Sequence, residues 1–347
     1  MKSLDKRNST FELLRIIAMF MIVYEHGLLA TSLNNYDTLS NMDNVSWLLE
    51  AFCVCAVNIF FLLTGYFLKN ESINYKKIII LWLRIFIYSV LIYSIFILYG
   101  IINFSTSDLI SYLFPITYDK YWFMQVYLAL MLLSPFVLKL LNMLDDKKHL
   151  SLICILVLLF SVHETFISVA NTLDQTQGYG ILWALTLFVI GNYIYKYKEK
   201  HKLLNLKSYV YLFLYILIAI VIFISNFIIV KYNIASCIES RGNFYAYNSI
   251  TVLAESIFLF LIFDNKKKKS NIFINLISSA QLDVYLISSH PLVLYWIWKQ
   301  FYFHKNLMSF LLLAILSLTI QVICTIIGLV LNKIFIDKIL NKQKYGK

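Results

Sequence analysis

The first apolar segment of the chain carries charged and titratable side chains that could perform acid–base chemistry. In FELLRIIAMFMIVYEHG, Arg15 and His26 are eleven residues apart. At about 100° per residue, this spacing returns the two side chains to within about 20° of one helical face, roughly 16 Å apart along the axis. Glu12 lies three residues before Arg15, close enough to neutralise it. Because an imidazole can take a proton from a hydroxyl near neutral pH, His26 is a candidate general base.

Each of these residues also has a purely structural explanation. Arg15 can pair with Glu12 or extend to the inner membrane interface, and His26 can be a hydrogen-bonded histidine that packs helices together. Ionisable groups inside a bilayer are costly and are functional candidates by default, although many only pair structurally. The shared face of Arg15 and His26 favours a function. Glu25 points about 100° away from His26, so a direct pair between these neighbours is not expected.

Weaker candidates lie further along the chain. His290, in SSHPLVLYWIW, follows Asp283 by seven residues, which places both side chains on one face of a continuous helix. Trp122 begins an apolar segment, where membrane proteins carry an interfacial belt of aromatic residues. A structural role is the alternative for both His290 and Trp122. Gly65, in FFLLTGYFL, is expected to permit a close approach of two helices or a bend.

The composition determines what kind of element must position these residues. The 347 residues are 60% hydrophobic and 14% charged, against roughly 45–50% and 25% in soluble domains. A water-soluble fold could not bury that much apolar surface. Aromatic residues make up 17% of the chain and only three residues are proline, which favours long helices over a barrel of short strands. We therefore expect an all-α, polytopic integral membrane protein.

The charge and the cysteines exclude other classes. A net charge of +11 would suggest a nucleic-acid partner in a soluble protein. In a membrane protein, Lys and Arg collect in cytoplasmic loops, so we expect the lipid bilayer and no nucleic acid as a partner. The five cysteines have the spacing of neither a disulfide framework nor a zinc site, so no metal is expected.

Apolar segments of about 20 residues predict ten membrane-spanning helices. They lie near residues 11–31, 46–68, 77–100, 121–142, 150–169, 179–196, 208–230, 246–264, 281–302 and 308–334. Of the 30 Lys and Arg residues, 22 fall in one set of connections, five in the other and three within spans. The positive-inside rule then places both termini in the cytoplasm. No connection is long enough for a soluble domain, so residues 1–347 are expected to form a single membrane-embedded domain with no soluble domain appended.

Several segments, in this order, resemble those of the bacterial acyltransferase-3 family of membrane acyltransferases. KRNSTFELLRIIAMFMIVYEHG is similar to the opening pattern of that family, with Arg7, Glu12 and an R-x10-H stretch from Arg15 to His26. VNIFFLLTGYFL resembles its second-helix FF-x-x-SG segment, YWFMQVYLALMLLSP its fourth helix, FVIGNYI its sixth and DVYLISSHP its ninth. The resemblance covers nearly the whole chain.

The resemblance implies an activity and a role for particular residues. Members of the family modify glycans and other envelope molecules in the bacterial cytoplasmic membrane with an acyl group from cytoplasmic acyl-CoA, most often acetyl-CoA. His26 would be the catalytic base. Asn58 stands where many members have Asp, and Thr64 where many have Ser. The other implied residues have three roles. Glu12 and Arg15 would assist the catalytic base. Arg7, Arg15 and Arg84 would bind the acyl donor, and Asn58, Trp122 and His290 would bind the acceptor.

These inferences predict transfer of an acetyl group, less readily a succinyl group, to a hydroxyl of a cell-surface polysaccharide or a lipid-linked glycan precursor. The alternative is a transporter or exporter of a glycan or glycolipid, in which the same polar residues would line a translocation path. A sensor or accessory membrane subunit is a third possibility. The sequence shows neither an inverted repeat nor paired interrupted helices, which weighs against transport.

Overall fold

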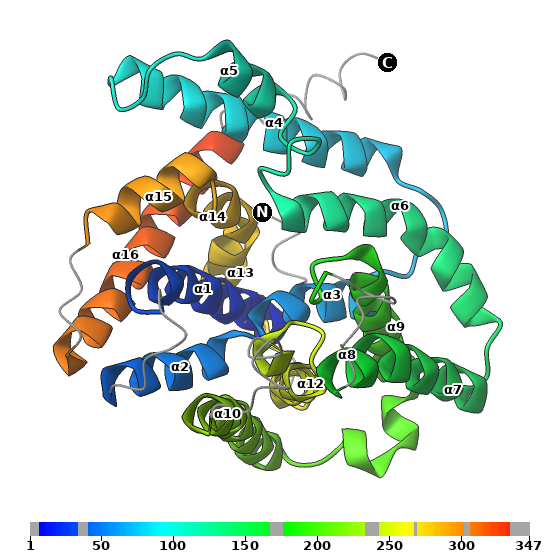
Figure 1. Ribbon diagram of the computed structural model, residues 1–347. Helices are drawn as coiled ribbons and strands as arrows, with labels where there is room; N and C mark the ends of the chain where they lie inside the picture. The colour runs from blue at the N-terminus through cyan, green and yellow to red at the C-terminus, as the bar shows by residue number, and fades with distance from the viewer. Residues whose placement is uncertain are drawn as a thin grey trace, which may run out of the picture. The chain divides into compact units, whose positions relative to one another are not determined.

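A computed structural model describes residues 7–33, 41–166, 176–232, 243–266, 269–301 and 306–333, and these ranges contain helices and no strand. The α-helices, shown in Figure 1, are α1 (Ser9–Thr31), α2 (Asn41–Cys53), α3 (Ala56–Phe67), α4 (Tyr75–Leu98), α5 (Thr106–Leu113), α6 (Trp122–Asn142), α7 (Asp146–Val157), α8 (His163–Phe166), α9 (Ile181–Tyr197), α10 (Ser208–Lys231), α12 (Ile250–Asp264), α13 (Ile272–Ser279), α14 (Gln281–Ser288), α15 (Pro291–Lys299) and α16 (Leu307–Leu331). A short π-helix, Leu158–Val162, joins α7 to α8. The predicted all-α class is confirmed.

Short polar side chains begin several of these helices. Asp145 accepts a hydrogen bond from Lys148 N at the start of α7, and Ser249 accepts one from Thr251 N at the start of α12. Asn306 caps α16 in the same way. These residues satisfy backbone N–H groups that the first turn of a helix leaves without a partner.

Seven helical segments are long and apolar enough to cross a membrane: Ser9–Thr31, Met42–Phe67, Tyr75–Leu98, Trp122–Asn142, Asp146–Phe166, Ser208–Lys231 and Leu307–Leu331. An eighth is the bent pair Ile272–Ser288 and Pro291–Lys299, if both parts form one span. Each of these segments corresponds to a predicted span. The two remaining predicted spans fall on α9 and α12, which have 17 and 15 residues. Both are shorter than the roughly 20 residues of a straight crossing, so the count of ten and the cytoplasmic termini stay predictions.

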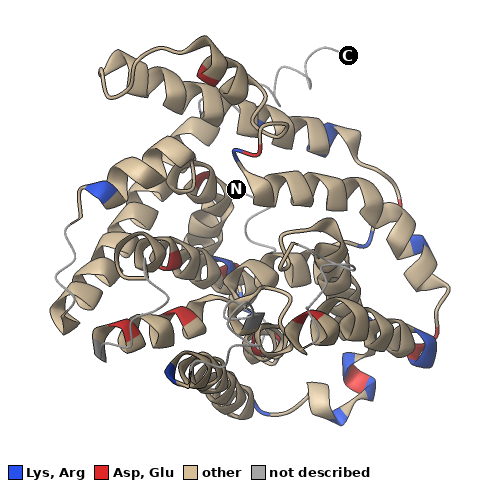
Figure 2. Ribbon diagram, viewed as in Figure 1, with Lys and Arg blue, Asp and Glu red and all other residues tan. Residues whose placement is uncertain are grey.

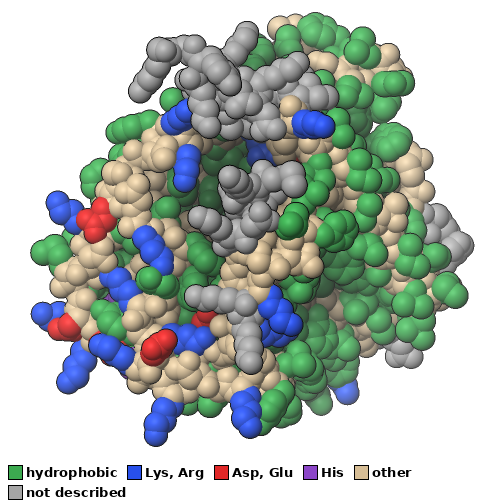
Figure 3. All heavy atoms as spheres, turned by 180° about the vertical axis from the view of Figure 1, so that it is seen from behind, with side chains coloured by type: hydrophobic (Ala, Val, Ile, Leu, Met, Phe, Trp, Pro, Cys, Tyr) green, Lys and Arg blue, Asp and Glu red, His purple; other side chains and the backbone are tan. Residues whose placement is uncertain are grey.

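The distribution of side chains fits a multi-pass membrane protein. Lys and Arg lie mostly at helix ends and in connections, while long stretches of helix carry no charge (Figure 2). Broad hydrophobic areas face outward in the space-filling view (Figure 3). On α10, the exposed apolar side chains include Phe213, Ile216, Ile220 and Ile224. Large exposed apolar surfaces of this kind are stable against lipid and unfavourable against water.

The described helices group into two compact units. Unit 1 comprises residues 1–31, 85–120 and 267–347, and unit 2 comprises residues 32–84 and 121–266. The chain passes from unit 2 into unit 1 within α4, at Ile85. That the chain forms a single domain stays a prediction.

In unit 1, the first helix packs against the last four. α1 contacts α13, α14, α15 and α16, and α14 also contacts α16. Apolar residues fill these interfaces, including the fully buried Leu14, Leu28, Val284 and Leu313. α1 is therefore surrounded by protein over much of its length and is not a peripheral anchor.

In unit 2, two pairs of helices form the main contacts. α3 packs along α9, and α10 packs along α12. A Cβ atom added at Gly65 would collide with the carbonyl oxygen of Phe188 on α9, and one added at Gly191 would collide with the carbonyl oxygen of Leu62 on α3. The predicted close approach at Gly65 is confirmed, because α3 and α9 touch backbone to backbone through these two glycines.

We expect Gly191→Leu to push α9 away from α3 and to lower the free energy of unfolding by about 1–3 kcal/mol, the usual cost of overpacking. Thermal denaturation of the full-length protein in detergent measures this loss. Leu182→Ile, at an exposed position on the same helix, is the control and should leave the melting temperature unchanged. Wild-type stability of Gly191→Leu would show that the two helices have room to separate.

Candidate functional site

The inner part of α1 carries an ion pair that is tied to α13. Arg15 Nη1 lies 2.6 Å from Glu12 Oε1, with exposed side-chain fractions of 28% and 8%. The other carboxylate oxygen, Glu12 Oε2, accepts a hydrogen bond from Ser278 Oγ. Glu12 therefore holds Arg15 in place while being held itself by α13. The predicted pairing of Glu12 with Arg15 is confirmed.

A second polar contact joins α1 to α14 and α16. Gln321 Nε2 donates to Ile16 O and to Gln281 Oε1, both at 2.9 Å. Asn332 Nδ2 donates to Asp283 Oδ2 at 2.8 Å, which connects α14 to the end of α16. The sequence analysis missed the glutamines, although a glutamine in an apolar helix is itself a signal because its amide needs a partner.

His26 lies near the outer end of α1, where α15 and α16 approach closely. A Cβ atom added at the next residue, Gly27, would lie 2.7 Å from Trp298 Cη2 and 2.9 Å from Leu313 Cδ1. The His26 side chain is half-buried. Its Nδ1 is buried and has no hydrogen-bond partner among the described residues. The ring is thus positioned by packing, and no protein group in the described ranges uses this nitrogen.

The ninth predicted span is broken, which the sequence analysis did not predict. α14 ends at Ser288 and α15 begins at Pro291, and the two parts are bent by 78°. Proline has no backbone N–H and disfavours helical dihedral angles in the residue before it. That residue, His290, is accordingly extended, with φ −61° and ψ 128°. The expectation that one continuous helix carries Asp283 and His290 on the same face is therefore wrong.

His290 occupies a position that stabilises this bend. Its Nδ1 accepts a hydrogen bond from Leu292 N at 3.2 Å, so the side chain caps α15. The imidazole stacks on Tyr112 at 5.1 Å between ring centroids, and Tyr112 in turn stacks on Tyr93 at 4.8 Å. His290 is fully buried. These contacts give it a structural role, and its predicted binding of the acceptor stays a prediction.

Tyr112 lies on α5, the short helix that follows α4 in the chain. Burial, followed by the nearby Asp108 carboxylate and Tyr93, raises the pKa of Tyr112 to about 12. Lys120 Nζ lies 4.6 Å from the centroid of the Tyr112 ring. The phenol therefore stays protonated at neutral pH and serves as a stacking surface for His290.

Three aromatic side chains gather at the start of α6 in unit 2. Trp122 lies 4.4 Å from Tyr179 and 5.9 Å from Tyr247 between ring centroids, and the two tyrosines lie 5.0 Å apart. Tyr179 is exposed, Trp122 is half-buried and Tyr247 is buried. Gly178 has a φ of +89°, and a Cβ atom there would lie 2.7 Å from Asn248 N. Glycine thus permits the tight turn that brings Tyr179 to Trp122.

Asn58 is hydrogen-bonded to the backbone of Tyr247, a member of this aromatic group. Its Nδ2 donates to Tyr247 O at 2.9 Å and to Ser256 Oγ at 3.1 Å, and its Oδ1 accepts from Trp183 Nε1 at 3.1 Å. Asn58 is fully buried. These bonds connect α3 to α9, to α12 and to the segment before α12, so they give Asn58 a structural role. Its predicted contact with the acceptor stays a prediction.

The predicted donor-binding arginines lie in different surroundings. Arg7 is exposed two residues before α1, whereas Arg15 is half-buried within α1. Both belong to unit 1. Arg84 is half-buried on α4 and is the last residue of its segment of unit 2. Donor binding by all three stays a prediction.

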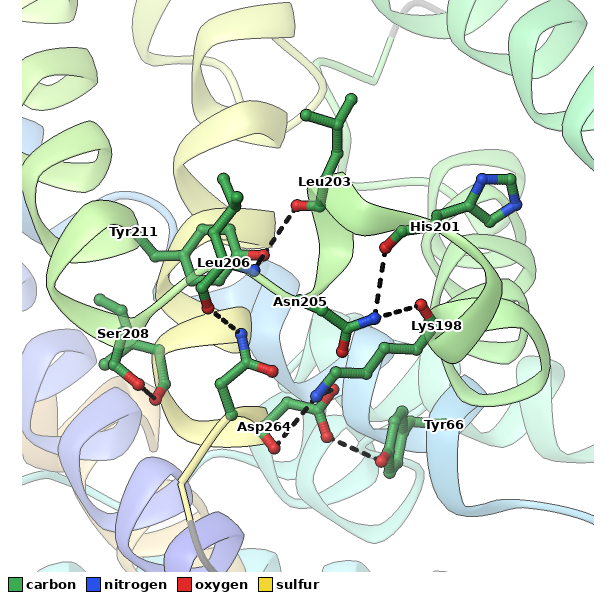
Figure 4. A network of polar contacts seen from close by, with 11 residues as sticks. Tyr66, Lys198, His201, Leu203, Asn205, Leu206, Ser208, Tyr211 and Asp264 are labelled. Carbon is green, nitrogen blue, oxygen red and sulfur yellow. Dashed lines mark hydrogen bonds and ion pairs between the residues drawn. The ribbon is translucent and has the colours of Figure 1, made fainter.

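One end of unit 2 is held by a polar network that the sequence analysis missed (Figure 4). Asp264, at the end of α12, lies 2.8 Å from Lys198 Nζ and accepts a hydrogen bond from Tyr66 Oη, also at 2.8 Å. Asn205 Nδ2 donates to Lys198 O at 2.6 Å. The network ties α3 and α12 to the connection between α9 and α10, and it contains none of the predicted site residues.

Comparison with known proteins identifies the family to which the chain belongs. A family model described as an acyltransferase domain matches residues 8–326. The chain belongs to this acyltransferase family. The matched residues include the Glu12–Arg15 pair, His26 and the bend before Pro291, and they extend over both units. No curated protein and no solved structure matches the chain. Together with its apolar helices, family membership makes the protein a multi-pass membrane acyltransferase.

Proposed function

We propose that this acyltransferase moves an acetyl group, less readily a succinyl group, from cytoplasmic acyl-CoA to a hydroxyl of a cell-surface polysaccharide or of a lipid-linked glycan precursor, in the bacterial cytoplasmic membrane. The observation that carries the proposal is His26. In a member of an acyltransferase family, it is a half-buried imidazole whose Nδ1 has no hydrogen-bond partner among the described residues.

His26 acts as the general base. As the acceptor oxygen attacks the thioester carbon, the acceptor O–H bond breaks and its proton passes to the imidazole. The new C–O bond forms and the carbonyl electron pair moves to oxygen, giving a tetrahedral oxyanion. When the intermediate collapses, the carbonyl re-forms, the C–S bond breaks, and His26 gives the acceptor's proton to the departing CoA sulfur. The chain itself is regenerated unchanged.

Arg15 serves the donor side. Glu12 fixes the guanidinium in one orientation, and the Arg15 side chain nevertheless remains 28% exposed. A guanidinium held in this way can form charge-assisted hydrogen bonds to the phosphates of CoA. Arg7, exposed just before the same helix, adds positive charge at that end.

The aromatic group formed by Trp122, Tyr179 and Tyr247 serves the acceptor. The C–H face of a sugar ring packs on flat aromatic surfaces, and Tyr179 and Trp122 offer such surfaces with at least part of each ring accessible.

Trp122→Ala is expected to raise the KM for the glycan acceptor about tenfold, because aromatic contacts are worth ~0.5–1.5 kcal/mol beyond the area they bury. The KM for acetyl-CoA should not change. Trp122→Phe keeps an aromatic face and is the matched control. An unchanged acceptor KM in Trp122→Ala would remove this group from the acceptor site.

The experiment that tests the proposed function compares the O-acetyl content of envelope glycans, by mass spectrometry, between cells with and without the protein. We expect O-acetyl groups to be lost with the protein and restored by expression of the wild type. Equal O-acetyl content in both strains would contradict the proposal.

One observation favours the rival transport function. Interrupted helices lie at the substrate sites of many transporters, and the bend between α14 and α15 is such an interruption. Purified protein in vesicles separates the two functions, because a transporter moves the glycan without consuming acetyl-CoA. Within the described residues the bend is the one interrupted pair of this kind, and the family match is to an acyltransferase.

A further inference from the structure

Several buried polar atoms of unit 1 have no hydrogen-bond partner among the described residues, and four of them lie on α1, at the bend between α14 and α15, and on α16. These four are His26 Nδ1 and the hydroxyl oxygens of Ser288, Ser289 and Ser317. Ser288 is 4% exposed and Ser317 is fully buried. A buried hydroxyl without a hydrogen bond costs about 1–3 kcal/mol, so each of these serines calls for a physical reason.

The helices that carry these groups pack against one stretch of α1. Gln321 Nε2 donates both to Gln281 Oε1, at the start of α14, and to Ile16 O on α1. Trp298, near the end of α15, lies against Gly27. The bent pair therefore approaches α1 near Ile16 and again at Gly27, beside His26. The bend, with Ser288 and Ser289, lies between these two contacts along the chain.

Ser317 lies on α16, which packs against the same stretch of α1. Gln321 contacts α1 at Ile16 and Leu313 contacts it at Gly27, so α16 runs antiparallel to α1. Ser317 lies midway between those two contacts and is thus level with residue 21 or 22 of α1. At ~1.5 Å per residue, this level is about 6–8 Å from that of His26.

Arg15 lies too far from His26 to act at the reacting carbonyl. Eleven residues of helix separate them by roughly 16 Å along the axis. The guanidinium is also directed toward Glu12, on the side of Arg15 away from His26. The negative charge that develops beside His26 must therefore be stabilised by groups that lie closer to His26 than Arg15 does.

The bend supplies groups of the required kind. α15 begins there, and the N-terminal end of a helix carries a partial positive charge. Its first N–H groups do not take part, because Pro291 has none and Leu292 N donates to His290 Nδ1. Serine hydroxyls can donate a hydrogen bond to an oxyanion. Non-helical backbone at membrane depth is tolerated where it lies inside protein or lines a polar site.

We propose that the bend at Ser288–Pro291, together with Ser317, binds the thioester carbonyl oxygen of the acyl donor and stabilises the oxyanion of acyl transfer. The inference rests on the proposed function and names the groups that complete it. The hydroxyls donate to the carbonyl oxygen as its electron pair arrives from the C=O bond. They release it when that bond re-forms and the CoA sulfur departs with the proton held by His26.

Ser288→Ala and Ser317→Ala, in the full-length protein, test this proposal. Removing one oxyanion donor lowers kcat by about 10²–10³-fold, and we expect losses of this size with the KM for acetyl-CoA unchanged. Neither hydroxyl has a partner among the described residues, so its removal should leave the melting temperature equal or higher. A structural serine would show the opposite pattern, with lower stability and unchanged kcat of the folded protein.

Thr319→Ala is the matched control on α16, because Thr319 is exposed and its hydroxyl donates to Ile315 O within the same helix. It should leave kcat unchanged. If the wild type transfers acetyl groups and Ser288→Ala, Ser317→Ala and the double variant all retain full kcat, the proposal for the bend is wrong and the proposed function stands. If the wild type does not consume acetyl-CoA, the proposed function fails, and the inference fails with it.

Discussion

His26→Ala is expected to lower kcat for acetyl transfer by about 10²–10⁴-fold, the range that general bases contribute. The loss should appear in kcat at saturating acetyl-CoA and acceptor, because His26 acts on the transferred proton and not on binding. The melting temperature should change little, since the His26 ring makes no hydrogen bond to the described residues through Nδ1. Steady-state kinetics of the purified protein, with its melting temperature measured in parallel, provide the test.

His149→Ala is a suitable contrast because His149 is a fully buried histidine with a structural role. Its Nε2 lies 3.2 Å from Val189 O, and its ring packs edge-on against Tyr193 and Tyr197. Its replacement should lower the melting temperature while the folded fraction keeps its kcat. If His26→Ala behaved like His149→Ala, His26 would be a packing residue and the proposed base would be wrong.

The second large effect is expected at the Glu12–Arg15 pair. Arg15→Gln leaves the buried Glu12 carboxylate with Ser278 but without its cation. Breaking a largely buried ion pair by removing one partner costs about 3–5 kcal/mol, less where water reaches the pair, as it does at Arg15. We therefore expect Arg15→Gln to be clearly destabilised and to have a raised KM for acetyl-CoA.

The double variant Glu12→Gln, Arg15→Gln separates these two effects. It removes both charges, and a glutamine at position 12 can still accept the hydrogen bond from Ser278. Stability should recover relative to Arg15→Gln, whereas the KM for acetyl-CoA should stay raised. Recovery of both properties would assign Arg15 a structural role only and would leave donor binding to other cations.

The sequence predicts best those features that depend on local geometry. Glu12 and Arg15 are three residues apart in one helix, so the helical repeat alone brings their side chains together. The apolar segments predict most spans because hydropathy and length determine which helices a bilayer accepts. Gly65 was identified because a small residue in an apolar helix permits close packing.

Contacts between distant segments could not be predicted in this way. Ser278 is 266 residues from Glu12, and Gln281 is 40 residues from Gln321. Each is recognisable as a polar residue in an apolar helix, but the sequence does not say which partner satisfies it. The aromatic group at Trp122 likewise depends on Tyr179 and Tyr247, which arrive from two other connections.

The bend before Pro291 was missed although its signal is present. Ser-Ser-His-Pro places two hydroxyl residues and a proline within an apolar run, and a hydropathy average over about 20 residues passes over it. Single residues decide the local backbone here, because proline removes one donor and constrains the residue before it. A search for proline within predicted spans would have found this site.

The most direct test of the central claim is transfer of labelled acetyl from acetyl-CoA to an envelope glycan by the purified full-length protein, compared between the wild type and His26→Ala. We predict that the wild type places the label on the glycan as an ester that mild base releases, with one CoA thiol formed for each acetyl group transferred. His26→Ala should form almost none. Equal labelling by both proteins, or movement of the glycan without release of CoA, would contradict the account.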